Sequence, residues 1–157
     1  MPIVIDANVL IALFRTATDD SEKIRINGLL ADAKANKKRL LIPSPALSEF
    51  SAKALQHELD FFTGQSVFQI APFDTKAALE CGEMLRSWAA GMDGGKKDRH
   101  KAKFDMQILA IAKSRGASLL ITGDANLRNK AIREKITAQQ ISDLPIPDSE
   151  RQLPIKY

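Results

Sequence analysis

The sequence predicts an α/β fold built on a parallel sheet of about five strands, and three observations lead to this class. Short apolar segments recur along the 157 residues. Segments with apolar residues at helical spacing separate them. Neither an internal repeat nor an interdomain linker interrupts this alternation. Strands that alternate with helices are typical of βαβ units, in which neighbouring strands run parallel.

Five short segments have the character of strands in such a sheet. Most are rich in Val, Ile and Leu and end at polar or charged residues, as strands covered on both faces do. The last is more polar than the others. The expected strands are residues 2–5, 39–42, 67–70, 118–122 and 139–141.

Six segments show the spacing or the boundary residues of helices. Ser44 and Pro45 mark one helix start, because Ser caps a helix and Pro fits its first turn. Asp74 is expected to cap the next helix, and Gly116 fits the position just after a helix end. The expected helices are residues 8–14, 22–37, 44–54, 74–89, 102–115 and 127–135.

The chain is expected to form one domain of residues 1–143 followed by a tail. The tail, residues 144–157, contains Pro145, Pro147 and Pro154, which disfavour regular structure. Residues 91–101 are glycine-rich and charged, so we expect a loop there.

Cysteine content, the N-terminal segment and the net charge limit the classes of protein to which this chain can belong. A single cysteine, Cys81, excludes an intrachain disulfide and a zinc site built from several thiolates. The apolar N-terminal segment is not preceded by a basic residue and is interrupted by Asp6 and Asn8, unlike a signal peptide. No apolar run approaches the roughly 20 residues of a membrane helix. We therefore expect a cytoplasmic protein with no membrane partner. A net charge of +4 permits a polyanionic partner.

Four acidic residues are expected to meet at one edge of the sheet. Asp6 ends the first strand, and Asp124 follows the fourth. Glu49 lies early in the helix after the second strand, and Asp105 lies near the start of the helix before the fourth. The helix of Asp105 runs antiparallel to the strands, so its start lies at their carboxyl edge. Ligands of open parallel sheets bind at that edge.

Each acid also has an ordinary structural interpretation. An Asp after a strand is usually a helix cap, as Asp6 or Asp124 would be. An acid near a helix start, such as Asp105, usually complements the helix dipole, and Glu49 alone is typical of a solvated helix face. Four acids that meet at one edge of a sheet for unrelated structural reasons are much less frequent than a single such acid. Asp105 also begins an apolar helical stripe, where an uncompensated acid is costly.

Converging carboxylates repel one another, so they either bind protons or surround a cation. Oxygen ligands favour Mg²⁺ or Mn²⁺, and two histidines without a cysteine cluster disfavour zinc. We expect Asp6 and Asp105 to be direct ligands, with Glu49 and Asp124 binding directly, through water, or by orienting the nucleophile. Without the metal, repulsion is expected to destabilise the fold, so that Asp105→Asn would stabilise the metal-free protein.

Three polar residues accompany these acids. Asn8, Thr122 and Asn126 are expected to support the metal ligands by hydrogen bonds, although ordinary turn chemistry explains Thr122 and Asn126 equally well. A divalent cation held in this way suits hydrolysis of phosphodiester bonds, because it orients the phosphate and activates water.

The residues around these acids resemble those of the PIN-domain ribonucleases, most closely the VapC-type toxins of toxin–antitoxin pairs. The segments that carry the resemblance are residues 3–10, 43–50, 102–113 and the Leu119–Asn126 run that ends in Thr-Gly-Asp-Ala-Asn. The resemblance spans about residues 2–143. It implies a three-layer α/β/α fold with strand order 3-2-1-4-5 and a metal-dependent endoribonuclease. The implied catalytic and metal-binding residues are Asp6, Glu49, Asp105 and Asp124.

The resemblance also implies partners. These are an RNA substrate, a cognate antitoxin protein and a second copy of the chain in a homodimer. A basic stretch leads directly to Asp105 and is expected to hold the RNA backbone, although a solvated loop is the simpler alternative. Its residues are Lys96, Lys97, Arg99, Lys101 and Lys103.

Other functions stay open. One is an RNA-processing nuclease without a toxin role, and another is a catalytically inactive PIN-like module that binds RNA or protein. A haloacid-dehalogenase-type phosphatase is disfavoured, because Asn8 stands where a second Asp would be needed. The sequence contains no GxxxxGK[ST] loop and no GxGxxG turn, which disfavours nucleotide hydrolysis and dinucleotide binding.

Overall fold

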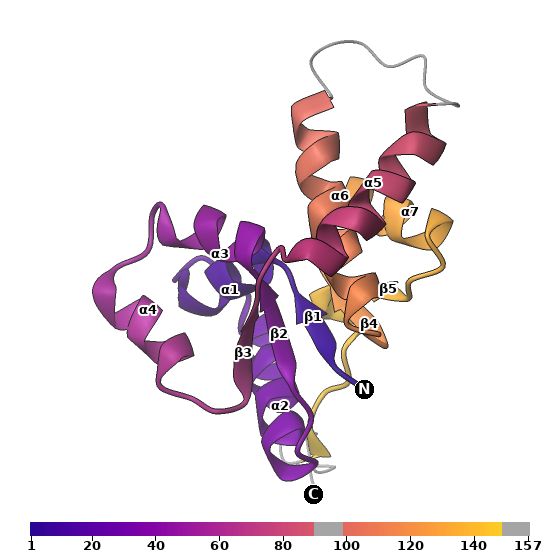
Figure 1. Ribbon diagram of the computed structural model, residues 1–157. Coiled ribbons are helices and arrows are strands. Elements are labelled where there is room, and N and C mark those ends of the chain that lie inside the picture. Colours follow the sequence, from indigo (N-terminus) through magenta and orange to yellow (C-terminus); the bar gives the residue numbers. More distant parts are fainter. Residues whose placement is uncertain (90–98, 149–157) are drawn as a thin grey trace, which may run out of the picture.

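A computed structural model describes residues 1–89 and 99–148. Its centre is a parallel sheet with the strand order β3-β2-β1-β4-β5, which confirms the expected class and order (Figure 1). The strands are β1 (Ile3–Ile5), β2 (Leu40–Pro43), β3 (Phe68–Ala71), β4 (Leu119–Ile121) and β5 (Ala138–Gln139).

Helices cover both faces of this sheet, giving three layers (Figure 1). α5 and α6 lie side by side and extend away from the strands, whereas α2 lies beneath the other face. The helices are α1 (Ala7–Phe14), α2 (Asp20–Ala35), α3 (Ser44–Ser51), α4 (Gln56–Thr63), α5 (Thr75–Ala89), α6 (Arg99–Ser114), α7 (Ala125–Arg133) and the short 3₁₀ helix η1 (Ile141–Asp143).

The core lies where the central strands meet α6. Every residue of β1 and β2 is buried, as expected for strands covered on both faces. On α6 the stripe of Ile108, Leu109 and Ala112 is buried, as its spacing predicts. α6 ends where Gly116 adopts a φ of +63°, and Ala117 N–H donates to the Ala112 carbonyl. Gly116 thus occupies the predicted position after the helix end.

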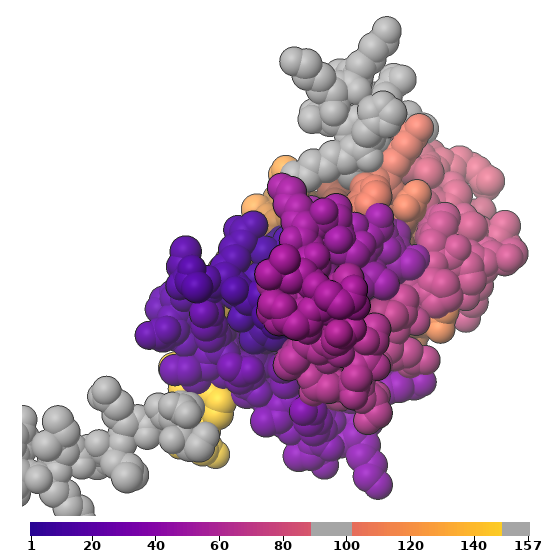
Figure 2. Space-filling model, turned by 90° about the vertical axis from the view of Figure 1, so that its left-hand side faces the viewer, coloured from indigo at the N-terminus to yellow at the C-terminus, as the bar shows by residue number. Residues whose placement is uncertain are grey.

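Two helices were not predicted from the sequence, the short η1 and the longer α4. α4 begins after Leu55, whose N–H donates to the Glu58 carboxylate at 2.7 Å. On α4, Phe62 packs its ring on Phe14 of α1 and Phe50 of α3, with ring centroids 5.7 and 5.2 Å apart. Figure 2 shows the N-terminal segment, in indigo, beside the purple and magenta segments that follow β2. The burial of this helix therefore depends on contacts with distant segments.

The start of α6 matters for the site. α6 begins at Arg99, three residues before the expected start, so the end of the predicted 91–101 loop is helical. The rest of that loop, residues 91–98, and the end of the tail, residues 149–157, lie outside the described residues. Across the described part of the chain, no helix has the length and apolarity needed to span a bilayer.

Candidate active site

Asp6 is fixed at the carboxyl end of β1. Its backbone N–H continues the sheet by donating to the Ile121 carbonyl of β4 at 3.0 Å. Its side chain is only 5% exposed. One carboxylate oxygen accepts from the Ala7 N–H at 2.7 Å, and the other accepts from the Thr122 hydroxyl at 2.6 Å. Both donors are neutral, so they orient the carboxylate without neutralising it.

Thr122 connects three of the predicted site residues. The parallel register pairs Ile5 with Ile121, so the next residues, Asp6 and Thr122, meet just beyond the strand ends. Thr122 is fully buried and donates its hydroxyl to Asp6. The same oxygen accepts from the Asp124 N–H at 3.1 Å and from Asn8 Nδ2 at 3.4 Å. Thr122 therefore has a structural role in orienting Asp6 and the start of α7.

Asn8 joins the same network through its other side-chain atom. Asn8 lies in the first turn of α1, and its Oδ1 accepts from the Gly123 N–H at 3.0 Å. The first turn of α1 is therefore tied to the turn between β4 and α7. The support that Asn8 would give to metal ligands stays a prediction.

Asp124 caps α7. Its Oδ1 accepts from the backbone N–H groups of Asn126 and Leu127 at 2.8 and 3.3 Å, and Asp6 similarly caps α1. The ordinary structural interpretation of both residues is therefore correct, and it is compatible with a site role, because a capping carboxylate keeps further lone pairs. Asn126 is exposed, and it joins this network through its backbone N–H.

Asp105 is the second buried carboxylate. It lies on α6 and forms an ion pair with Lys130 of α7, in which Nζ and Oδ2 are 2.6 Å apart. The two side chains are only 8% and 14% exposed, so water screens this pair weakly. The predicted repulsion at Asp105 is thereby offset by a charge within the chain. The expectation that Asp105→Asn stabilises the metal-free protein is therefore reversed, because the substitution would leave the Lys130 ammonium unpaired.

Glu49 is exposed on α3, and its charge acts on Asp6. Burial is the largest cause that raises the pKa of Asp6 above its usual value of 3.8. The hydrogen bonds from Thr122 and Ala7 lower this pKa, whereas the charges of Glu49 and Asp105 raise it. Three of the four predicted acids are thus near enough for their charges to interact.

The donor chemistry of these acids fits a hard divalent cation, although their positions are not those of a closed metal site. All four candidates offer carboxylate oxygens, and Asp6 is buried beside like charges. Among the side chains that the structure describes, no three Asp, Glu, His or Cys groups are arranged closely enough to hold a metal ion. One of these carboxylates already has a cationic partner, because Oδ2 of Asp105 accepts from Lys130 at 2.6 Å.

The predicted RNA-binding residues are described only in part. Lys103 is exposed on α6, two residues before Asp105. Arg99 and Lys101 belong to the first turn of that helix. Lys96 and Lys97 lie outside the described residues.

Sequence reasoning missed Lys130. It shares a face of α7 with Leu127 and Ala131, which are both buried. Its Nζ also lies 5.5 Å from the ring centroid of Trp88 on α5, and the Arg133 guanidinium lies 4.4 Å from the same ring. A lysine on the apolar face of a charged helix was the signal available in the sequence.

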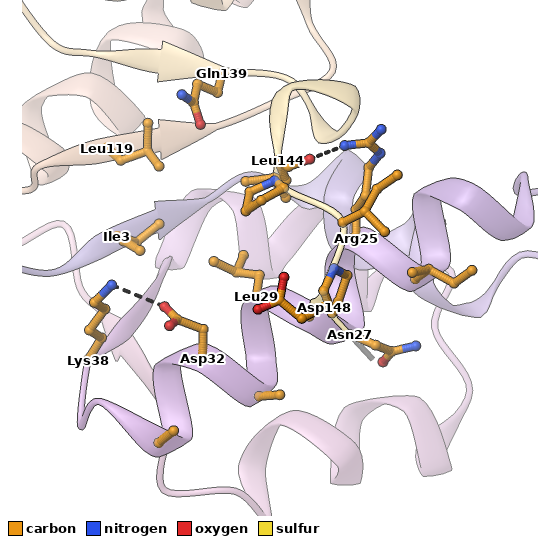
Figure 3. Close-up of a pocket in the computed structure, with 17 residues that line it drawn as sticks. Ile3, Arg25, Asn27, Leu29, Asp32, Lys38, Leu119, Gln139, Leu144 and Asp148 are labelled. Carbon is orange, nitrogen blue, oxygen red and sulfur yellow. Dashed lines mark hydrogen bonds and ion pairs between the residues drawn. The ribbon is translucent and has the colours of Figure 1, made fainter. Parts of the chain in front are cut away.

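The structure also contains a cavity of about 860 Å³ away from these acids. It lies between α2, the segment 144–148 and the first residues of β1 and β4, Ile3 and Leu119 (Figure 3). Arg25 of α2 donates to the Leu144 carbonyl across this region. Since β1 and β4 begin here, the cavity lies at the opposite edge of the sheet from Asp6 and is separate from the acidic site.

Comparison with known proteins places the chain in a family. The sequence profile of the PIN domain matches residues 3–133. No curated protein is a significant match by sequence. The structure of VapBC2 from Rickettsia felis, bound to a DNA fragment from its promoter, is similar with a TM-score of 0.64 and 19% identity, covering 89% of this chain and 98% of that chain. DNA-bound VapBC from Salmonella typhimurium is similar with a TM-score of 0.58 and 23% identity, covering 90% and 98%.

At these identities the two structures show a shared fold. The profile, in contrast, spans most of the sequence, from β1 through the four acidic residues to the end of α7. The resemblance that the sequence motifs indicated is thereby confirmed: the chain belongs to the PIN-domain family.

Proposed function

We propose that this PIN domain is a Mg²⁺- or Mn²⁺-dependent endoribonuclease. The observation that carries the proposal is Asp6, a buried carboxylate at the carboxyl edge of a parallel sheet. Its pKa is raised by burial and by the charges of Glu49 and Asp105. A carboxylate kept in such surroundings costs stability, which is typical of a functional site.

Asp6 and Asp105 would hold the cation directly, and Glu49 and Asp124 would complete or orient its surroundings. A bound divalent cation would orient the scissile phosphate, stabilise developing charge and lower the pKa of an attacking water. Thr122 holds the Asp6 carboxylate at 2.6 Å, and Asn8 ties the neighbouring turn to α1. These two residues keep the acidic edge ordered, as the second layer of hydrogen bonds around a metal site does.

The direct test is cleavage of end-labelled RNA by the purified full chain. Addition of Mg²⁺ or Mn²⁺ should produce fragments with 5′-phosphates, and excess EDTA should abolish them. Asp6→Asn prepared in the same way provides the control for contaminating nucleases. Cleavage that is unchanged in EDTA, or equal in the variant, would refute the proposal.

The basic residues Lys96, Lys97, Arg99, Lys101 and Lys103 would hold the RNA backbone. Lys103 supports this proposal by its exposure on α6 close to Asp105 in the sequence. If these side chains meet phosphates, each neutralised residue should flatten the log–log salt dependence of RNA binding by about 0.7. An unchanged slope would show that these basic residues form a solvated surface and do not contact the RNA phosphates.

We further propose that the nuclease is a cytoplasmic toxin of a type II toxin–antitoxin pair, silenced by a cognate antitoxin and assembled as a homodimer. The two similar structures, which are VapBC complexes, support this role. The cognate antitoxin would be encoded by the gene beside the one for this chain. Expression of the wild type in a host lacking that neighbouring gene should arrest growth, whereas Asp6→Asn should not. Co-expression of the neighbouring gene should relieve the arrest.

The alternatives give different results in the same experiments. A harmless wild type whose purified protein cuts RNA would indicate an RNA-processing nuclease. A protein that binds RNA without cutting it would indicate an inactive PIN-like module. Light scattering of the purified chain tests the homodimer separately.

A further inference from the structure

Lys130 is a partly buried cation at the candidate active site that the proposed chemistry does not use. Its ammonium lies 2.6 Å from Oδ2 of Asp105, and its side chain is only 14% exposed. On another side it faces Trp88, with 5.5 Å between Nζ and the ring centroid. An aromatic face attracts a cation but carries no full negative charge. Asp105 is therefore the carboxylate that balances the Lys130 charge.

The position of Lys130 follows from the packing of α7. Leu127 and Ala131 bury the same face of the helix, which directs the neighbouring Lys130 stem toward α6. Arg133 also lies over Trp88, but the structure places its side chain in no ion pair with Asp105. Lys130 and Arg133 of α7 thus share an aromatic neighbour, and of these two it is Lys130 that contacts Asp105, whereas Arg128 of the same helix donates to the Thr122 carbonyl at 3.0 Å.

The ammonium and a divalent cation would use the same carboxylate. A cation bound at Asp105 would share the carboxylate with Lys130, which already donates to Oδ2, and it would be repelled by the ammonium at close range. Release of Lys130 from Asp105 would remove both obstacles. The arrangement of acids agrees with this, because the described side chains do not form a closed metal site.

We infer that Lys130 is an internal counter-ion of Asp105 that competes with the divalent cation, stabilising the metal-free fold and lowering cation affinity. The inference rests on the proposed function, since it concerns the cation of that site. It assigns to Lys130 a positioning role, exerted through Asp105.

The test is direct measurement of Mn²⁺ binding to the metal-stripped full chain by calorimetry. Lys130→Met should bind Mn²⁺ about tenfold more tightly than the wild type, because a like charge beside the ligand is removed. Lys130→Arg keeps the charge, and Arg133→Met removes a charge from the same helix beside the same Trp88. Both controls should stay within about twofold of the wild type.

Thermal melts provide a second readout. In EDTA, Lys130→Met should melt at a lower temperature than the wild type, because Asp105 loses its partner. Saturating Mn²⁺ should raise its melting temperature by more than it raises that of the wild type. If Lys130→Met does not fold, Lys130→Gln, which keeps a hydrogen-bond donor without the charge, takes its place.

The outcomes separate the inference from the proposed function. Equal or weaker Mn²⁺ binding by Lys130→Met and Lys130→Gln, with normal binding by the wild type, would overturn the counter-ion role and leave the metal-dependent nuclease intact. Absence of Mn²⁺ binding by the folded wild type would overturn both. Tighter binding by Arg133→Met to the same extent would show a general charge effect and would also overturn the inference.

Discussion

The two edges of the sheet are built from different chemistry. At the carboxyl edge, buried Asp6 and Asp105 are held by a hydroxyl, a backbone N–H and an ammonium. At the amino edge, α2 and the segment 144–148 enclose a cavity through apolar contacts and the Arg25–Leu144 hydrogen bond. There Gly28 allows close approach, because an added Cβ would lie 2.4 Å from Pro147 Cγ.

The difference separates function from packing. Buried carboxylates are costly, and Asp6 and Asp105 are the two buried carboxylates among the described residues, so their position at the carboxyl edge is typical of a functional site. The described residues of the amino edge include no buried carboxylate, and its ion pair between Asp32 and Lys38 is exposed. Substitutions at the first edge should therefore change activity, whereas those at the second should change only stability.

The largest expected effect separates the edges by activity. Asp6→Asn should lower the rate of RNA cleavage on the order of a thousandfold, because it removes charge from the proposed cation site while keeping the shape of the side chain. Gly28→Ala, the matched change at the amino edge, should keep the wild-type rate at a temperature where both are folded. Single-turnover cleavage of one RNA measures both. A large loss of the cleavage rate in Gly28→Ala would contradict the assignment of activity to the carboxyl edge alone.

The second effect sharpens the contrast between the two buried carboxylates. Asp105→Asn should lower the free energy of unfolding in EDTA by about 2 kcal/mol, because it leaves a poorly solvated ammonium unpaired. Asp105→Asn combined with Lys130→Met should recover part of that loss, since neither charge remains. Urea unfolding of the two single variants and the double variant measures the coupling. Greater stability of Asp105→Asn would show that repulsion among the acids outweighs the ion pair.

The contrast also explains what the sequence could predict. Asp6 and Asp124 follow buried strands, and parallel topology brings strand ends together, so a local pattern was sufficient to place them. The buried stripe on α6 likewise showed that Asp105 faces inward. These positions depend on periodicity and connection rules, which a single sequence contains.

Lys130 and α4 depend on contacts between distant segments. Lys130 meets Asp105 across 25 positions, and the direction of its long side chain is set by how α7 packs on α6. α4 packs its Phe62 on Phe14 and Phe50, which come from other helices. Neither the crossing of two helices nor a shared aromatic cluster is contained in a local pattern, so both were missed.

A smaller effect tests the packing at the amino edge. Gly28→Ala should lower the free energy of unfolding by about 1 kcal/mol, because the new methyl group would overlap the Pro147 ring and displace the chain around it. Gly82→Ala is the matched control, because an added Cβ there meets no atom within 4 Å, and helix propensity should make it neutral or stabilising. Urea unfolding measures the stability of both variants. Equal stabilities would show that Pro147 moves away from the new methyl group at little cost in free energy.

The smallest effect concerns the pH dependence contributed by Asp6. Its folded pKa is raised by burial and only partly lowered by Thr122 and Ala7, so the native state binds a proton more tightly than the unfolded chain. The contribution of Asp6 to the free energy of unfolding should be highest below the unfolded pKa of 3.8, and it should fall as pH rises from there through the folded pKa. Asp6→Asn cannot titrate, so its stability advantage in EDTA should grow across this window and then level off.

Thr122→Val sharpens this last measurement. Removal of the hydroxyl that donates to Asp6 should raise its pKa further and extend the window to higher pH, because the charged carboxylate loses a favourable contact. Urea unfolding at a series of pH values in EDTA gives the differences among wild type, Asp6→Asn and Thr122→Val. A difference between wild type and Asp6→Asn that stays constant with pH would show that burial does not shift Asp6. The charge at this edge would then carry no cost to the fold, and the contrast between the two edges would rest on Asp105 alone.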